Sequence, residues 1–335
     1  MLQAIVGFVF YLGSFQEIYP ILREFPSSSR ARGSYINPNH YVAVLSMSAP
    51  FLFGWVYYLY QRKRDYLSGE DPQSLRDHRY LTSGQIFFAT FLLVMVLVGV
   101  VISRSKMGIF SALSAFLLMV LLAQLKGRQT RLLVGSFLIL GGVCAYLAWI
   151  GLGPILARIT TVLDAGYWEN NSRILIWKDE LRLLLDYPWL GTGLGTFGTA
   201  FHKYQTTNVT IWFDQAHNDY LQFATELGMI GFLFLFGAIF YLVFRMIRSF
   251  LTDSSRYRAS VTLGCIGGVS ALLVHSVTDF NLQIPANAMM FSVILGIGYK
   301  ASCLERKTSS RGKRGDPPLS ITSVRKSVSD KRSIL

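Results

Sequence analysis

The chain has 335 residues, of which 52% are hydrophobic and only 15% are charged, and its mean hydropathy is +0.39. Charged residues make up about 25% of an ordinary soluble domain, so this composition excludes one. The net charge of +13 is concentrated between the apolar runs and at the C-terminal end. The sequence therefore predicts an all-α, polytopic integral membrane protein.

Apolar runs predict seven membrane-spanning helices, at about residues 41–60, 84–103, 107–124, 132–152, 229–247, 259–277 and 285–303. Each run is close to the ~20 residues that a helix needs to cross the ~30 Å hydrocarbon core of a bilayer. Residues 1–11 are apolar but short, so they predict either an eighth span or the end of one. They lack the basic start and the small-residue cleavage site of a signal peptide.

Lysine and arginine are distributed unevenly over the segments that join these spans. They are abundant in four regions, namely residues 61–80, 125–131, 245–258 and the tail after Lys300. When the spans alternate in direction, these regions share one side of the membrane, which the positive-inside rule makes the cytoplasmic side. The opposite side receives residues 12–40, 103–106, 153–228 and 278–284.

This topology divides the chain into four regions. Residues 1–152 form an N-terminal membrane region of four to five spans, and residues 153–228 form an extracytoplasmic loop with amphipathic helices. Residues 229–303 form a three-span membrane region, and residues 304–335 form a basic, disordered cytoplasmic tail. The positive charge of the tail is expected to attract it to anionic membrane lipids. It has no interleaved aromatic residues and no accompanying fold motif, so no nucleic-acid partner is expected.

The extracytoplasmic loop begins with a predicted amphipathic helix. Ser172 can cap it, and its apolar positions repeat every three or four residues, at Ile174, Trp177, Leu181, Leu184 and Leu185. Such a helix lies on the membrane surface or against the spans. Tyr187-Pro188 ends the helix, and the glycines at 191, 193 and 195 then permit a tight, irregular backbone. Gly193 is a candidate for supporting a ligand, with a plain loop as the alternative.

His217 is the candidate catalytic residue of this loop. It lies just before a long apolar helix, next to Asn218 and between Asp214 and Asp219, whose carboxylates could orient the ring or raise its basicity. The simpler alternative is a structural loop histidine. His275 and Asp279 are further polar candidates at the same side of the membrane.

Cationic residues on the same side predict a bound anion. Arg104 and Lys106 separate two apolar spans where the charge rule disfavours arginine, and Arg173 lies in the extracytoplasmic loop. Arginine's planar fork suits phosphate oxygens, although an interfacial arginine can also extend to lipid headgroups. The acids show no metal-ligand spacing, so neither a metal nor another cofactor is expected. A lipid-linked diphosphate fits this pattern: the diphosphate would leave as an acceptor hydroxyl, deprotonated by His217, attacks the group that it carries.

Six short segments resemble those of the O-antigen ligase and polymerase family of bacterial membrane glycosyltransferases. They occur in the same order as in the family and cover about residues 30–300. They are Arg32 to His40, Ser103 to Lys106, Asn171-Ser172-Arg173 with Trp177, Pro188 to Gly195, Ala216-His217-Asn218 with Glu226-Leu227-Gly228, and His275-Ser276 with Asp279 to Leu282 and Pro285. The family usually has further spans before this point, so the chain is expected to be a shortened member.

The resemblance implies an inverting, metal-independent transfer of glycan from an undecaprenyl diphosphate carrier to a glycan, lipid or protein acceptor. It implies His217 as the base, Arg104 and Arg173 as the diphosphate-binding residues, and a site facing the periplasm from the bacterial inner membrane. Two other functions stay open from the sequence. One is a membrane transporter, since some relatives are described as inorganic-carbon transporters, and the other is a non-catalytic component of polysaccharide assembly or export.

Overall fold

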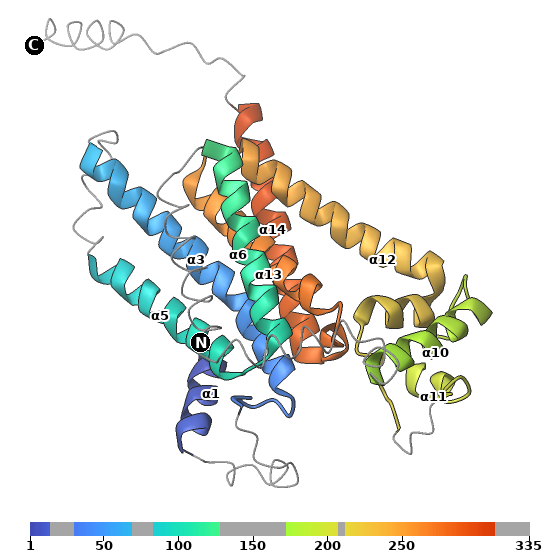
Figure 1. The fold of residues 1–335 in the computed structure, drawn as a ribbon. Coiled ribbons are helices and arrows are strands. Elements are labelled where there is room, and N and C mark those ends of the chain that lie inside the picture. Colours follow the sequence, from blue (N-terminus) through green and yellow to red (C-terminus); the bar gives the residue numbers. More distant parts are fainter. Residues whose placement is uncertain (14–29, 69–82, 128–171, 207–211, 312–335) are drawn as a thin grey trace, which may run out of the picture. The chain divides into compact units, whose positions relative to one another are not determined.

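The computed structural model describes residues 1–13, 30–68, 83–127, 172–206 and 212–311. All regular structure within these ranges is helical (Figure 1). The α-helices are α1 (Leu2–Gly13), α3 (Pro38–Ser68), α5 (Ser83–Ile102), α6 (Lys106–Gly127), α10 (Ser172–Asp186), α11 (Phe197–Phe201), α12 (Asp219–Thr252), α13 (Arg256–His275) and α14 (Pro285–Arg311), with a 3₁₀ turn η3 at Asn281–Gln283.

Five of the described helices, α3, α5, α6, α12 and α13, are long and apolar enough to cross a membrane. The prediction of an all-α, polytopic membrane protein is therefore confirmed. The predicted span at 285–303 is helical, as part of α14, but is not among these five. The predicted span at 132–152 and most of the basic tail lie outside the described residues, so the total of seven or eight spans stays a prediction.

Local sequence signals explain where the helices begin. Pro38 and Pro285 occupy the first position of α3 and α14, where the missing backbone N–H costs nothing. Ser255 caps α13 by accepting a hydrogen bond from the backbone N–H of Arg258 at 3.5 Å. Asn218 caps α12 in the same way. A membrane helix still has unpaired backbone groups at its ends, and these caps satisfy part of them.

The core is centred on α13. Of its most apolar stretch 72% is buried within the protein, compared with 17% for α12. Glycines allow the backbone of α13 to approach α3 closely. A Cβ atom added to Gly54 would lie 2.7 Å from the carbonyl oxygen of Ser260, and one added to Gly268 would lie 2.8 Å from that of Met47. Small residues at such crossings are typical of helix packing in membranes, where close van der Waals contact drives association.

A bend at Gly228 divides α12 into two parts, residues 219–227 and 229–252 (Figure 1). Gly228 has φ 65°, a left-handed conformation that favours glycine. A Cβ atom at this position would lie 2.2 Å from the carbonyl oxygen of Trp189, so any other residue would collide with the preceding loop. The bend separates the long apolar part of α12 from the short part that follows His217.

Hydrogen bonds join segments that the sequence assigned to the same side of the membrane. Arg30 Nε donates to the carbonyl oxygen of Ser103 at 2.8 Å, and His40 Nδ1 lies 3.3 Å from Asn281 Oδ1. Regions assigned to the other side are also joined: Lys126 Nζ donates to the carbonyl oxygens of Phe250 and Asp253, at 2.7 Å each. The contacts of Arg30 with Ser103 and of His40 with Asn281 involve segments that carry candidate site residues, namely Arg104 and Asp279.

Candidate active site

The backbone at His217 turns sharply, and neighbouring residues hold it in place. His217 has φ 56°, which is uncommon for a residue other than glycine and is found often at functional sites. Ala216 is fixed on both sides. Its carbonyl oxygen accepts from Trp177 Nε1 at 2.9 Å, and its N–H donates to Gln222 Oε1 at 3.0 Å. Asn218 Oδ1 then accepts from the N–H of Leu221 at 3.2 Å and starts α12.

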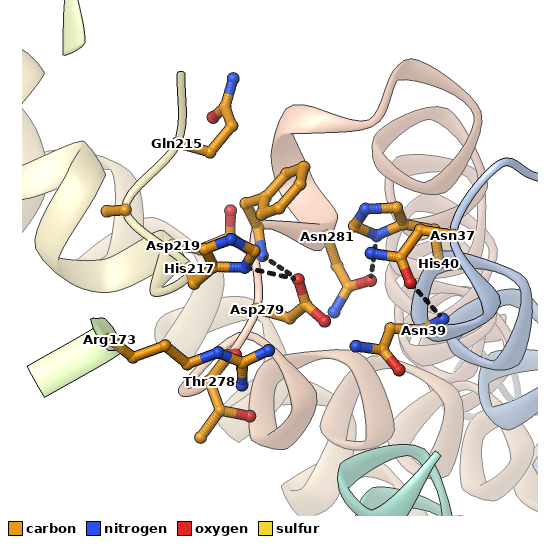
Figure 2. A network of polar contacts seen from close by, with 12 residues as sticks. Asn37, Asn39, His40, Arg173, Gln215, His217, Asp219, Thr278, Asp279 and Asn281 are labelled. Carbon is orange, nitrogen blue, oxygen red and sulfur yellow. Dashed lines mark hydrogen bonds and ion pairs between the residues drawn. The ribbon is translucent and has the colours of Figure 1, made fainter. Parts of the chain in front are cut away.

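Asp279 is the carboxylate beside the His217 ring (Figure 2). His217 Nδ1 lies 3.6 Å from Asp279 Oδ1, an ion-pair distance slightly longer than a hydrogen bond. The backbone N–H of Phe280 donates to the same oxygen at 3.0 Å. Burial raises the pKa of the Asp279 carboxyl, but His217, the nearby His40 and His275 rings and the Phe280 N–H outweigh burial and lower the pKa to about 2. Asp279 is therefore a buried, charged carboxylate at neutral pH.

The two acids that flank His217 in sequence have other surroundings. Asp219 is buried, and its Oδ2 accepts from the N–H of Leu282 at 2.9 Å while its own N–H donates to the carbonyl oxygen of Ser276 at 3.0 Å. Asp219 thus joins the start of α12 to the segment after α13. Asp214 is exposed and lies against Gly198 of α11. The pairing of His217 with Asp279 is a contact that sequence proximity did not indicate.

Arg173 extends from the first turn of α10 to the same segment. Its Nη1 donates to the carbonyl oxygen of Thr278 at 3.0 Å, next to Asp279 in the chain (Figure 2). Arg173 and His217 therefore meet at residues 278–279. This is the arrangement expected of a site that binds an anion and moves a proton.

Arg30 connects the Arg104 turn to this region. Its Nη2 donates to Asn39 Oδ1 at 2.9 Å, and its Nε holds the carbonyl of Ser103, the residue before Arg104. Burial lowers the pKa of Arg30, whereas the negative charge of Asp279 raises it, so Arg30 lies within electrostatic reach of Asp279. Arg104 is exposed with φ 49°, and Lys106 is exposed at the start of α6.

Sequence reasoning did not select Arg30, although the signal was present. Arg30 lies in residues 12–40, on the side of the membrane where the charge rule disfavours arginine. The charge rule disfavours Arg104 for the same reason, and it applies equally to Arg23 and Arg32, so only the contacts of Arg30 distinguish it from them.

A polar network lies beside the His217–Asp279 pair. Asn287 Nδ2 donates to the carbonyl oxygen of His40 at 3.2 Å, and Tyr35 Oη donates to Asn287 Oδ1 at 3.0 Å. The Phe280 ring has edge contacts with His40 and His217, with ring centroids 4.6 Å and 4.9 Å apart. Phe280 thus packs between two histidines. It keeps the His217 ring in a defined orientation, since an aromatic edge contact favours a limited set of geometries.

His275 is the last residue of α13. It is fully buried, and neither ring nitrogen has a hydrogen-bond partner in the part of the chain that the structure describes. Buried polar atoms without partners are rare and occur at functional sites or where water is bound. No three His, Cys, Asp or Glu side chains of the described residues are grouped so that they could hold a metal ion.

The glycine run after α10 wraps around the bend of α12. The N–H groups of Gly195 and Phe197 donate to the two oxygens of Glu226, at 2.9 Å and 3.2 Å, and the Gly193 N–H donates to the Glu226 carbonyl oxygen at 2.9 Å. A Cβ atom at Gly191 would lie 2.4 Å from that carbonyl oxygen. These contacts with Glu226 hold the loop onto the helix that follows His217.

Comparison with known proteins adds a second line of evidence. Residues 91–236 match the family model described as O-antigen ligase. This part of the chain is therefore similar to the O-antigen ligase family. The matched range includes the Arg104 turn, Arg173 on α10 and His217, whereas Arg30, His40 and Asp279 lie outside it.

A curated relative gives no further detail on function. A Haemophilus influenzae protein, described only as an uncharacterized protein, is 26% identical over 140 residues, which amount to 38% of this chain and 35% of that protein. The match thus covers about a third of the relative. The site residues outside the O-antigen ligase range are supported by the fold alone.

Proposed function

We propose that the chain transfers a glycan from an undecaprenyl diphosphate-linked donor to an acceptor hydroxyl in cell-surface polysaccharide biosynthesis. The observation that carries the proposal is the convergence of His217, Asp279 and Arg173 within the O-antigen ligase context. A ligase adding glycan to lipid or protein and a polymerase adding it to another glycan would use the same chemistry. In each case the enzyme is an inverting, metal-independent glycosyltransferase.

His217 acts as the general base in this proposal. Its Nδ1 faces Asp279, so Nε2 is the nitrogen that takes the proton from the acceptor hydroxyl. The histidine side chain is 28% exposed, which leaves the ring accessible to an acceptor, whereas the carboxylate of Asp279 is 2% exposed. The negative Asp279 stabilises the imidazolium that forms and orients the ring, as the acid of a catalytic triad does.

The arginines act on the leaving group. The acceptor oxygen attacks the anomeric carbon of the donor sugar, the bond between that carbon and the diphosphate oxygen breaks, and the diphosphate leaves with its electron pair. Arg173 and Arg104, with Lys106, stabilise the charge that develops on the diphosphate. A single displacement of this kind inverts the configuration at the anomeric carbon.

The test is glycan transfer by the purified protein in lipid nanodiscs, with a carrier-linked glycan as donor. His217→Ala is expected to reduce transfer by about 10²- to 10⁴-fold, the contribution of a positioned base, while donor binding is retained. His202→Ala is a matched control, because His202 follows α11 and packs on Trp212, at a ring-centroid distance of 3.5 Å. Equal activity of the two variants would show that His217 is not the base.

The orientation in the membrane is part of the same proposal. The site faces the periplasm and the C-terminal tail faces the cytoplasm, supported by the distribution of lysine and arginine. In intact spheroplasts, which expose the outer face of the bacterial inner membrane, Lys203→Cys should react with an impermeant thiol reagent. Ser254→Cys should react only after lysis. The reverse labelling pattern would place the site on the cytoplasmic side and exclude a periplasmic donor.

A further inference from the structure

An exposed apolar patch lies where α10 is joined to α11. Four large side chains form it, and we call them the Trp189 patch. They are Leu185, Trp189, Leu190 and Leu194, which are 76%, 68%, 78% and 67% exposed. Contiguous large apolar residues are rarely left on the surface of a soluble domain, and they mark sites of contact with a partner or a membrane.

Backbone hydrogen bonds fix the centre of this patch to the apolar part of α12. The N–H of Met229 donates to the carbonyl oxygen of Pro188 at 2.8 Å, and the N–H of Ile230 donates to that of Trp189 at 3.3 Å. The first N–H groups of a helix have no partner within it, and the bend at Gly228 creates such a start. The loop supplies the missing acceptors, so Trp189 lies at the level of the first turn after the bend.

The length of the apolar part of α12 sets the height of that turn in the bilayer. Met229 to Phe244 contain no charged residue, and Arg245 and Arg248 follow. These sixteen residues span roughly 24 Å at 1.5 Å per residue. The hydrocarbon core is thicker, about 30 Å, so it extends at least to Met229. Pro188 and Trp189, whose carbonyl oxygens are held by Met229 and Ile230, therefore lie at the boundary of the core, and Leu190 follows them in the chain.

The face of α12 next to this boundary is itself exposed and apolar. Ile230, Leu233 and Phe234 are 57%, 62% and 82% exposed, and their spacing of three and four residues places them on one side of the helix. This side meets lipid in a membrane-spanning helix. The Trp189 patch continues the lipid-facing surface from the helix into the loop.

We propose that the Trp189 patch inserts into the leaflet on the side of His217, at the boundary between headgroups and acyl chains. Tryptophan is favoured at this depth, because its ring is largely apolar and its N–H can still reach the headgroups. The lipid bilayer is the partner. This inference depends on the membrane fold and not on the proposed glycan transfer.

Insertion has one consequence that does depend on the proposed function. Helix α10 begins at Ser172, next to Arg173, and ends at Asp186, next to the patch. An inserted patch holds this helix at the membrane surface. The diphosphate of a lipid-linked donor lies at the same height, so insertion would place Arg173 where the donor arrives.

The experiment measures the depth of a nitroxide spin label at Leu190→Cys by power saturation, with oxygen and a nickel chelate as relaxants. The vesicles contain phosphatidylethanolamine and phosphatidylglycerol. Cys144 and Cys303 are replaced by serine, and the fully buried Cys265 is retained. Phe234→Cys on the lipid-facing side of α12 is the matched control for the membrane, and Lys203→Cys, at an exposed position just after α11, is the matched control for water.

The label at position 190 is expected to favour oxygen, as at position 234, while the label at position 203 favours the nickel chelate. Nickel accessibility at position 190 equal to that at 203 would overturn the proposal. In a transfer assay, Trp189→Asp should raise the KM for the donor several-fold, while Trp189→Phe should not. If all variants lack transfer, the depth measurement still decides whether the patch inserts, so the two proposals are tested separately.

Discussion

His217 Nδ1 and Asp279 Oδ1 lie 3.6 Å apart, although one residue precedes α12 and the other follows α13. Both segments are held by further contacts. The Asp219 N–H donates to the carbonyl oxygen of Ser276, and Arg173 donates to that of Thr278. The pair therefore depends on the packing of α12 against α13, which brings the two helix ends together.

Asp279→Asn is expected to reduce glycan transfer by at least about tenfold with little change in donor binding. The amide keeps the size of the carboxylate but loses the charge that stabilises the protonated His217 ring. Transfer and donor binding are measured separately in nanodiscs. Asp214→Asn is the control, since this carboxylate is exposed and lies against α11. Unchanged transfer in Asp279→Asn would remove the orienting role from this residue.

Arg173→Lys and Arg104→Lys are expected to weaken donor use by about tenfold or more each. Lysine keeps the charge, but it cannot make the two parallel hydrogen bonds that arginine makes to phosphate oxygens. The measurement is kcat/KM with a carrier-linked donor. Arg182→Lys, on the exposed side of α10 and paired with Asp179 at 3.2 Å, should have wild-type activity. Wild-type values in both site variants would indicate arginines that contact lipid headgroups instead.

Gly228→Ala is expected to destabilise the loop and lower activity together. The new Cβ atom would meet the carbonyl oxygen of Trp189 at 2.2 Å, in a backbone conformation that disfavours alanine. Thermal unfolding in detergent, followed by circular dichroism, should show a lower Tm. Gly237→Ala in the same helix is the control, because nothing lies within 4 Å of its added Cβ, and alanine there stabilises by up to about 1 kcal/mol. A Tm equal to that of Gly237→Ala would contradict the packing at the bend.

Raising the pH is expected to loosen α10. Glu180 of α10 is buried, and burial raises its pKa well above the usual value, although its contact with Thr225 of α12 partly opposes this. The folded protein holds the Glu180 proton more tightly than the unfolded chain. Stability is therefore full below the unfolded pKa and falls as the pH rises through the folded pKa.

Glu180→Gln should remove this part of the pH dependence, because the amide does not ionise. The measurement is the Tm of wild type and variant as a function of pH, together with the fluorescence of Trp177 on the same helix. Glu226 is also buried on α12 and adds to the raised pKa of Glu180 through its charge. Parallel curves for the two proteins would show that ionisation of Glu180 does not limit stability.

The sequence alone determined the class of the protein and predicted the sides of its segments. Apolar runs near twenty residues are forced to be helices in a bilayer, because no water is present to satisfy the backbone. His217, Arg104 and Arg173 could be selected because charged and titratable residues at the membrane surface are costly. The family resemblance rested on the same residues, and the match over residues 91–236 agrees with it.

The tertiary structure decided which residues meet. The contacts of His217 with Asp279 and Phe280, and of Arg30 with the Arg104 turn, join segments that are far apart in the chain. Periodicity and charge describe each helix by itself and carry no information about its neighbours. The bend at Gly228 is decided in the same way, since the loop that contacts it is fixed by Glu226 and by the carbonyl groups of Pro188 and Trp189. Helix packing, and not the local sequence, sets these distances.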